Sequence, residues 1–341
     1  MSKHRVFRPA RTVLACALVT LLAAACGLRT GNGGGGEGEA AAFEPARTEF
    51  LVHTGPGGGS DVFVRDTIAM MRKEKIITSN WPVRNQTAGE GAGAMSYLLS
   101  KKGSGDNISA MTTTWLTTPL TIDGATVSTA DLTPIAGLII EPEVMAVPAD
   151  SPYGSLTDFV NAAKARPGAL VQTGGSTTEV SALNGAILEA ETGADWKFLS
   201  FEEVGQRITA LLNGDADMMF GSAQDFAAQV KAGKLKIIAS ISPNPSPVYP
   251  DAPTVKAQGY KSTLVPQVRG IMAPPEIPQQ ARDYYQRVFS ELVKTESWKQ
   301  FAKENGVVTQ LLVGDQWGQY LAQQNAVVKK ALETADLGNG G

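Results

Sequence analysis

Cysteine is almost absent from this chain, which has two among 341 residues, Cys16 and Cys26. Cys16 lies within an apolar segment and Cys26 directly follows it, so residues 27–341 contain none. The main body of the protein therefore has no disulfide and no cysteine nucleophile. It must be stabilised by its hydrophobic core alone, which a chain of this length is large enough to build.

Histidine and the common catalytic motifs are scarce as well. Beyond His4 the only histidine is His53, and a lone histidine beside a buried strand is more often packed than catalytic. The chain has no Gly-x-Ser-x-Gly elbow, no Walker lysine motif and no His-Glu-x-x-His pair. Asp215 and Asp217 form an acidic pair, but paired acids alone do not make a glycosidase. Aromatic residues, at 7%, are also few for a sugar-binding cleft. We therefore predict that the protein is not an enzyme.

Positive charge is also in deficit. Residues 1–25 hold four basic residues and no acid, so the remainder carries 26 basic and 33 acidic side chains, a net charge of −7. An acidic body argues against a nucleic-acid partner, which would require a basic patch. Apolar residues make up 43% and charged residues 18%, so neither a disordered chain nor a multi-span membrane protein is expected.

The one long apolar run, Thr12 to Ala25, has 14 residues and follows a basic stretch. It is too short to span a bilayer comfortably, and it predicts that residues 1–25 are a signal peptide. The run ends in a sequence that resembles a bacterial lipobox, Leu22-Ala23-Ala24-Ala25-Cys26-Gly27. We expect Cys26 to be lipidated; the alternative is an ordinary signal peptide in which Cys26 is incidental.

A glycine-rich segment follows the lipobox, with Gly33 to Gly36 consecutive. Its composition predicts a flexible tether, so residues 26–46 are expected to comprise the lipidated cysteine and a linker. The protein is thus expected to be exported and anchored by lipid to the cell membrane, on the periplasmic or outer surface.

The folded body opens with a predicted strand, Phe50 to His53, and then the loop Pro56-Gly57-Gly58-Gly59-Ser60-Asp61. The glycines allow backbone conformations closed to other residues, and Ser60 and Asp61 are good helix N-caps. Such a loop presents free backbone N–H groups and the positive end of a helix dipole, which form an anion site without a basic side chain. A tight turn that binds nothing is the alternative.

The same plan recurs in the middle of the chain. Residues 169–173 predict a strand, 180–191 predict a helix, and between them lies Gly174-Gly175-Ser176-Thr177-Thr178-Glu179. One such loop in each half of the chain predicts two loops that face each other across a cleft. Just before this unit, Ser155 has the capping-box spacing that opens a helix through Ala165.

Strands alternate with helices along the rest of the body, which predicts an α/β fold with sites beyond the carboxyl ends of the strands. The spacing Gly89-x-Gly91-x-x-Ala94 formally matches a dinucleotide fingerprint. It lies in the second strand–helix unit of an exported protein, however, and we expect no cofactor.

The order of these features resembles the extracytoplasmic solute receptors of tripartite tricarboxylate transporters, the Bug-type periplasmic receptor family. The resemblance runs from about residue 47 to 335 and rests on the order and spacing of short motifs. They are the first glycine loop with Arg65, Asn85…Gly91-Ala92-Gly93, Val147-Pro148-Ala149-Asp150-Ser151-Pro152-Tyr153, Ala163-Lys164-Ala165-Arg166-Pro167-Gly168, Ala210-Leu211-Leu212-Asn213-Gly214-Asp215-Ala216-Asp217, Ala232-Gly233-Lys234-Leu235, Ala252-Pro253-Thr254-Val255…Gly259-Tyr260 and Arg269-Gly270-Ile271…Ala273-Pro274.

The resemblance implies a two-lobed periplasmic binding protein, a type II-like flytrap in which each lobe is a mixed sheet flanked by helices. It divides the body into lobe 1, residues 47–146 plus 266–341, and lobe 2, residues 147–265. In the family, carboxylates are held largely by main-chain N–H groups and waters of the two loops. Ser176 and Val180 stand where the family commonly has a glycine and a histidine, and Trp115 is unusually bulky near the expected cleft.

We expect no catalytic residue and no metal site. Asp61 is expected to turn back and cap its own helix, because its charge would otherwise repel an anion. The expected ligand-binding residues are Gly57, Gly58, Gly59, Ser60, Asp61, Asn85, Thr113, Trp115, Gly175, Ser176, Thr177, Thr178 and Asp217.

The sequence thus predicts a monomeric, lipid-anchored receptor that captures a small organic anion, such as a di- or tricarboxylate, for the permease subunits of a tripartite transporter. Ligand that bridges both loops would favour the closed arrangement of the lobes. A secreted two-lobed hydrolase and a ligand sensor for a signalling partner are the alternatives. The missing nucleophile–base pair argues against the hydrolase, whereas transport and sensing need the same flytrap.

Overall fold

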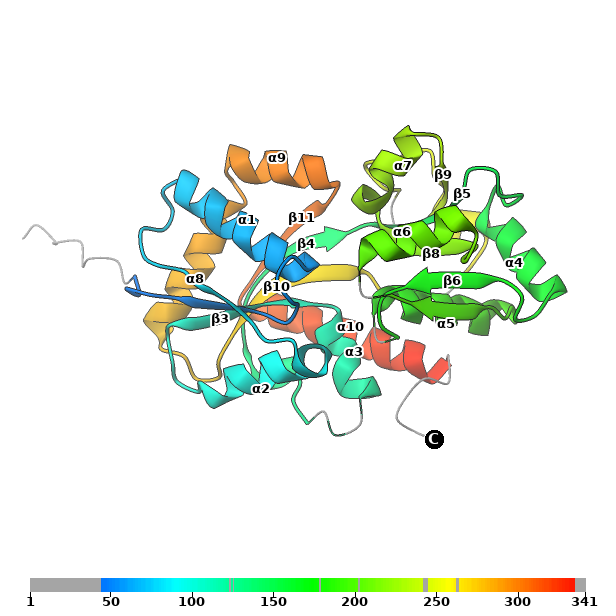
Figure 1. Cartoon of the computed structure of the whole chain (residues 1–341). Helices are drawn as coiled ribbons and strands as arrows, with labels where there is room; N and C mark the ends of the chain where they lie inside the picture. The colour runs from blue at the N-terminus through cyan, green and yellow to red at the C-terminus, as the bar shows by residue number, and fades with distance from the viewer. Residues whose placement is uncertain are drawn as a thin grey trace, which may run out of the picture. The chain divides into compact units, whose positions relative to one another are not determined.

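The computed structural model describes residues 44–122, 124, 126–177, 179–201, 203–241, 245–261 and 264–334. The predicted signal peptide, Cys26, most of the tether and Thr178 lie outside these residues. The described chain forms two β-sheets, each with helices on both faces (Figure 1). The predicted α/β fold with two mixed sheets is therefore confirmed.

The first sheet has six strands in the order β11-β4-β10-β3-β1-β2. β1 is parallel to β2 and β3, whereas β10 is antiparallel to β3 and β4, and β11 is antiparallel to β4. The strands are β1 (Glu49–Val52), β2 (Val83–Asn85), β3 (Asn107–Thr112), β4 (Thr133–Glu141), β10 (Gln267–Ala273) and β11 (Val308–Val313).

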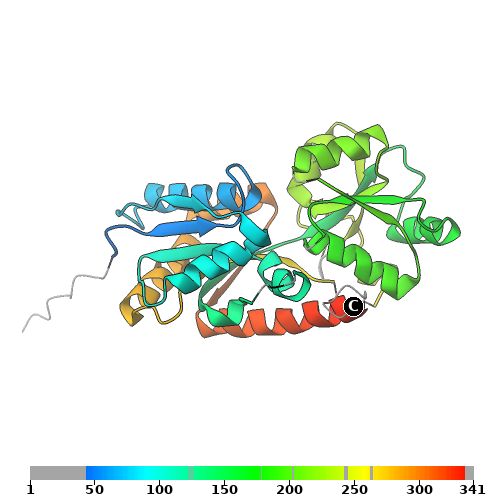
Figure 2. The same cartoon turned by 60° about the horizontal axis from the view of Figure 1, so that its bottom comes forward.

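Helices from distant parts of the sequence cover both faces of this sheet. One face packs against α1 (Gly59–Lys73), α8 (Gln279–Leu292) and α9 (Glu296–Asn305). The other packs against α2 (Ala92–Ser100), α3 (Thr114–Thr121) and α10 (Asp315–Thr334). Figure 2 shows α1 in blue and α10 in red on opposite sides of the strands.

The second sheet has five strands in the order β7-β6-β8-β5-β9. β6 is parallel to β7 and β8, and β5 is antiparallel to β8 and β9. The strands are β5 (Glu143–Pro148), β6 (Val171–Gly174), β7 (Lys197–Ser200), β8 (Met218–Ser222) and β9 (Leu235–Ser240).

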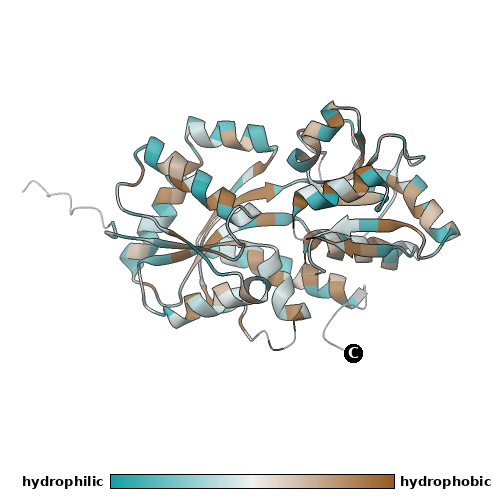
Figure 3. Cartoon of the chain, in the orientation of Figure 1, coloured by the Kyte–Doolittle hydropathy of each residue, from teal (hydrophilic) through white to brown (hydrophobic). Residues whose placement is uncertain are grey.

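Alternation along β5 shows how this sheet builds a core on each face. Met145 and Val147 point to the side of α4 (Leu156–Ala165) and α5 (Val180–Thr192). Val144 and Ala146 point to the side of α6 (Val204–Asn213) and the 3-10 helix η3 (Ala223–Phe226), which runs into α7 (Ala227–Lys231). In Figure 3 hydrophobic residues colour much of the strands, while the helices alternate hydrophobic and hydrophilic residues.

Local signals set the ends of several helices. Ser155 accepts a hydrogen bond from the amide of Asp158 at 3.1 Å, and α4 ends at Ala165, so the predicted helix is confirmed. Short 3-10 helices complete the chain: η1 (Ala88–Gly91), η2 (Thr129–Asp131) and η4 (Lys256–Gln258). None of the helices in the described ranges combines the length and apolar character needed to cross a bilayer.

The chain leaves the first sheet at Pro142, between the end of β4 and the start of β5, and returns to it before β10. The lobe boundary expected at residues 146–147 falls inside β5, which pairs along its length with the second sheet. Pro142 has no N–H group and cannot continue the ladder of β4, which is why the strand breaks there. The division into two lobes that move as units stays a prediction.

Trp317 of α10 packs against the first sheet. Gly137 on β4 and Gly270 on β10 are paired across neighbouring strands. A Cβ atom on either glycine would lie 2.4 Å from an atom of the Trp317 ring. Because the two glycines have no side chain, they leave the space that this buried indole fills.

Candidate functional site

The turn that leads into the first glycine loop, residues 54–58, lies between β1 and α1. Gly57 has φ +82°, which favours glycine, and the amide of Gly58 donates to the carbonyl of Gly55 at 3.0 Å. A Cβ atom on Gly58 would lie only 2.8 Å from the Cβ of Thr54. The turn therefore requires glycine at both positions.

Helix α1 begins at Gly59, with Gly58 as the N-cap and no side-chain cap. In the part of the chain that the structure describes, the amides of Gly59 and Ser60 have no hydrogen-bond partner. These two N–H groups lie at the positive end of a 15-residue helix. They are the unpartnered donors at the predicted anion site, where Gly59 is exposed and Ser60 is buried.

Asp61 turns back toward the loop as predicted, but it binds an amide that precedes the N-cap, so the predicted helix cap is absent. Its Oδ2 accepts the amide of Gly57 at 2.9 Å, and Arg65 donates to both carboxylate oxygens at 2.9 Å. The hydrogen bonds from Arg65 are the main cause that lowers the pKa of Asp61 to about 2. Asp61 is thus ionised but compensated, and it takes one N–H group of the loop for itself.

Asn85, at the end of β2, supports the loop. Its Nδ2 donates to the carbonyl of Thr54 at 2.8 Å and to Oδ1 of Asp61 at 2.9 Å. The hydroxyl of Thr54 accepts the amide of Asp61 at 3.2 Å. Asn85 therefore lies at the predicted site, where its amide nitrogen holds the loop and the carboxylate of Asp61 in place.

Arg269 of β10 lies beside the start of α1, although it was not among the expected site residues. Its Nη1 donates to the Ser60 hydroxyl at 3.4 Å, and its Nη2 lies 3.5 Å from where a Cβ of Gly59 would be. It also makes a two-pronged ion pair with Glu141 of β4, at 2.6 and 3.2 Å. An arginine directly before the apolar end of a strand, residues 270–273, was the signal that could have found it.

Thr113 and Trp115, just after β3, are both buried. The Thr113 hydroxyl donates to the carbonyl of Pro266 at 2.8 Å and accepts the amide of Val268 at 2.9 Å, so it ties β3 to the returning strand β10. The indole N–H of Trp115 donates to Nδ1 of His53 at 3.2 Å. Trp115 has no exposed surface, and its link to the loop runs through His53.

The second loop repeats the arrangement of the first. The Glu179 carboxylate accepts the amide of Gly175, four residues earlier, and pairs with Arg207 of α6 at 3.4 Å. Burial is the main cause that raises the pKa of Glu179. In each glycine loop, therefore, a glycine amide donates a hydrogen bond to an acidic side chain four residues later in the sequence, and that acid also pairs with an arginine. Thr177 lies in this loop next to Thr178, which falls outside the described residues.

Ser176 joins the second loop to the first half of the chain. Its hydroxyl donates to Oε2 of Glu90 in η1 at 3.0 Å. Glu90 has φ +49°, a left-handed conformation that is uncommon for a residue with a side chain, and its carbonyl accepts the hydroxyl of Thr118 at 2.8 Å. The loop after β6 and the segment before α2 are therefore in direct contact.

Asp217 is not brought to this group of residues. It precedes β8, and its carboxylate accepts the amide of Val171, the first residue of β6, at 2.8 Å. β6 and β8 are parallel, so Asp217 lies at their amino ends, whereas the Gly174–Gly175 loop follows the carboxyl end of β6. Because Asp217 directly precedes an apolar strand in the sequence, it could have been predicted to lie at the amino end of that strand.

Buried acids lie where the chain crosses between the sheets. Burial raises the pKa of Glu143 to about 8, and the side chain accepts a hydrogen bond from Asn184 at 3.3 Å. Burial also raises the pKa of Asp225 to about 6. Asn184 further binds both the amide and the carbonyl of Val265, at 2.8 and 3.0 Å, and so ties α5 to the returning chain.

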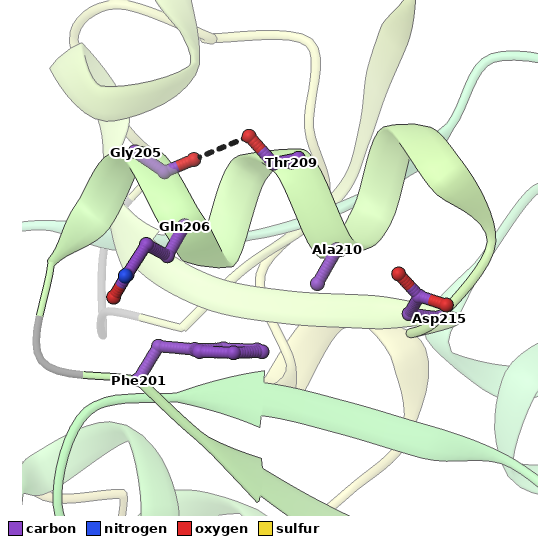
Figure 4. A pocket seen from close by; sticks show the side chains of 6 residues that line it. All are labelled: Phe201, Gly205, Gln206, Thr209, Ala210 and Asp215. Carbon is purple, nitrogen blue, oxygen red and sulfur yellow. Dashed lines mark hydrogen bonds between the residues drawn. The ribbon is translucent and has the colours of Figure 1, made fainter.

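A shallow groove of about 340 Å³ lies along α6 (Figure 4). Its lining carries one carboxylate and no basic side chain, so it offers nothing that would hold an anion. None of the expected site residues contributes to it. Its lining residues are Phe201, Gly205, Gln206, Thr209, Ala210 and Asp215.

Comparison with known proteins agrees with this architecture. A family model described as a tripartite tricarboxylate transporter family receptor matches residues 71–337. A curated relative, the UPF0065 protein in the tcbD–tcbE intergenic region of Pseudomonas sp. strain P51, is 25% identical over 257 residues, which cover 74% of each chain.

Solved structures share the fold at low sequence identity. A TctC solute-binding protein from Polaromonas is 23% identical, with a TM-score of 0.71, over 85% of this chain and 99% of that one. The R. palustris protein Rpa4515 with adipate is 17% identical, with a TM-score of 0.76, over 85% and 97%. MatC from Rhodopseudomonas palustris with bound malate is 19% identical, with a TM-score of 0.71, over 84% and 98%. These likenesses confirm the predicted two-lobed periplasmic binding protein fold.

The family match covers most of the chain, and the fold agrees with it. Members of such a family act outside the cytoplasm as solute-binding receptors and are not enzymes. This chain therefore belongs to the tripartite tricarboxylate transporter receptor family.

Proposed function

We propose that the protein captures a small organic anion whose carboxylate binds at the amino end of α1. The observation that carries this proposal is the pair of unpartnered amides, Gly59 and Ser60, with the guanidinium of Arg269 beside them. Backbone N–H groups at a helix start are natural partners of a carboxylate, and each charge-assisted hydrogen bond contributes about 1.5–3 kcal/mol. The adipate and malate of the two R. palustris structures support this ligand class.

The oligomeric state, the membrane anchor and the transporter partner are proposed from the sequence. We propose that the mature protein is a monomer held to the outside of the cell membrane by a lipid on Cys26, with residues 27–46 as a tether. It delivers its ligand to the permease subunits of a tripartite transporter. The two lobes close over the ligand, with the Gly175–Thr177 loop on the far side from α1.

A proline substitution at the first residue of α1 tests the anion site. Gly59→Pro removes one of the two free N–H groups, and proline is favoured at the first position of a helix. Gly58 already has the extended conformation that a residue before proline needs. We expect the variant to fold as the wild type does and to bind its acid on the order of tenfold more weakly.

The binding assay is a thermal-shift screen of malate, adipate, citrate and benzoate, followed by calorimetry, with neutral sugars and amines as controls. The matched variant is Glu296→Pro, which places proline at the first position of α9 after an N-cap that is also extended. Stabilisation by sugars or amines alone would refute the proposal, as would equal affinity of Gly59→Pro and wild type.

A further inference from the structure

His53 is the last residue before the first glycine loop, and it is the only histidine among the described residues. Its side chain is half-buried. The ring lies against the indole of Trp115, with the two ring centres 6.1 Å apart and the planes at 66°. His53 thus stands between the buried core under β1 and the loop that leads to α1.

The hydrogen bond from Trp115 fixes which nitrogen of His53 carries the proton. An indole N–H group can only donate, so Nδ1 of His53, at 3.2 Å, must be the unprotonated acceptor. In a neutral imidazole the proton then resides on Nε2. Trp115 is fully buried, and a Cβ on Gly91 would lie 2.9 Å from its indole nitrogen, so the donor is packed tightly in place.

The imidazole stays uncharged under physiological conditions. Burial, and the positive charge of Arg269, lower the pKa of His53 to about 4. No hydrogen bond within the described ranges engages Nε2, so its N–H group is left for water or a ligand. Arg269 also contacts Ser60 at the start of α1, which places His53 and the free helix amides around the same cation.

We propose that the Nε2–H group of His53, held in that tautomer by Trp115, donates a hydrogen bond to a carboxylate oxygen of the bound ligand. This inference rests on the proposed function and adds a side-chain donor to the main-chain site. Because an N–H donor can receive no hydrogen bond, this position selects an acceptor and disfavours an ammonium group. Trp115 is a positioning residue that acts through His53.

The tautomer is tested first, without any ligand. The full chain has two histidines, so the imidazole nitrogen signals of 15N-labelled protein can be assigned by comparison with His53→Gln. We expect a protonated Nε2 and an unprotonated Nδ1 throughout pH 5–8, and a mixture of tautomers in Trp115→Phe. A proton on Nδ1 in the wild-type protein would overturn the inference.

Binding is then measured by calorimetry with whichever of malate, adipate or citrate binds the wild type most tightly. His53→Gln places an amide N–H donor near the position of Nε2 and should bind within a few-fold of wild type. His53→Leu keeps a side chain of similar bulk without a donor and should bind on the order of tenfold more weakly. Adding the bound carboxylate to the wild-type protein at constant pH should also shift the nitrogen signal of His53 Nε2.

A double-mutant cycle separates positioning from a general structural effect. Trp115→Phe should weaken binding in the wild-type background and have no further effect in the His53→Leu background. Equal weakening in both backgrounds would mean that Trp115 does not act through His53. If the acid binds but His53→Leu binds it as tightly as wild type, this inference is wrong and the proposed function stands. If none of the acids binds the wild type, both fail.

Discussion

At the scale of the residue, the two glycine loops are each closed by one of the chain's own carboxylates. Asp61 holds the amide of Gly57 and Glu179 holds that of Gly175, and each acid pairs with an arginine. The sequence predicted that both loops present free N–H groups to a ligand. At the start of α1, the amides of Gly59 and Ser60 have no hydrogen-bond partner among the described residues. We therefore expect side chains beside the start of α1, such as Arg269, to contribute to selectivity together with these amides.

Gly270 offers a direct test of residue-level packing. Gly270→Ala should destabilise the protein by roughly 1–3 kcal/mol, because the added methyl group would overlap the ring of Trp317. Gly205→Ala is the control, since nothing lies within 4 Å of its added Cβ. Urea denaturation of both variants measures the difference. Equal stability of Gly270→Ala and the wild type would show that the indole can move aside at no cost.

At the scale of the element, strand β5 begins with a buried acid, Glu143, directly after the chain crosses from β4. Burial keeps the pKa of Glu143 near 8, above the value near 4.5 of an exposed glutamate. Between these pH values the folded state holds a proton that the unfolded state releases. The contribution of Glu143 therefore lowers the stability of the fold as pH rises from about 4.5 to about 8.

Glu143→Gln should remove this dependence, because glutamine resembles the protonated acid at every pH. We expect the variant to equal wild type near pH 5 and to exceed it in free energy of unfolding at pH 8. Denaturant titrations at pH 5, 6.5 and 8 measure both. Glu291→Gln, on the exposed side of α8, should follow the wild-type curve. Parallel curves for Glu143→Gln and wild type would contradict the assignment.

Local signals predicted the elements better than the contacts between them. The helix opened by Ser155 and the two strand–loop–helix units could be read from the sequence, because capping and glycine turns depend on neighbouring residues. The position of Arg269 could not, because β10 inserts between β3 and β4 from more than a hundred residues away. The orientation of Asp61 likewise depends on Asn85, which arrives from another strand.

The position of Asp217, in contrast, was predicted wrongly although the sequence holds the information needed to place it. The sequence predicts it among the ligand-binding residues of the cleft. Its position before the strand, together with the parallel pairing of β6 and β8, places it at the other end of the sheet. A rule about strand direction, applied to the sequence, would have separated it from the loop.

At the scale of the whole molecule, the proposed lipid anchor is at a residue outside the described part of the chain. If Cys26 carries the lipid, Cys26→Ser should move the protein from the membrane fraction to the soluble fraction. The folded domain should be unaffected, because residues 44–334 build both sheets without it. Detergent phase partitioning of both forms measures the change. Equal partitioning of wild type and Cys26→Ser would rule out a lipid at this cysteine.

α10 joins parts of the molecule that the strand order keeps apart. Its first turns pack on β4 and α3, and Val328 and Leu332 near its end share a hydrophobic cluster with Leu183 and Ile187 of α5. The helix that closes the chain thus contacts the helices of both sheets. Any relative movement of the two lobes must also change this apolar contact.

The place of Trp317 also constrains how such a sequence can evolve. The indole, Gly137 and Gly270 come from three distant stretches of sequence and fill one space. A relative that gains a side chain at either glycine position must first, or at the same time, replace the tryptophan with a smaller residue. Among descendants of a common ancestor these three positions should therefore vary together, and a lineage that keeps the tryptophan should keep both glycines.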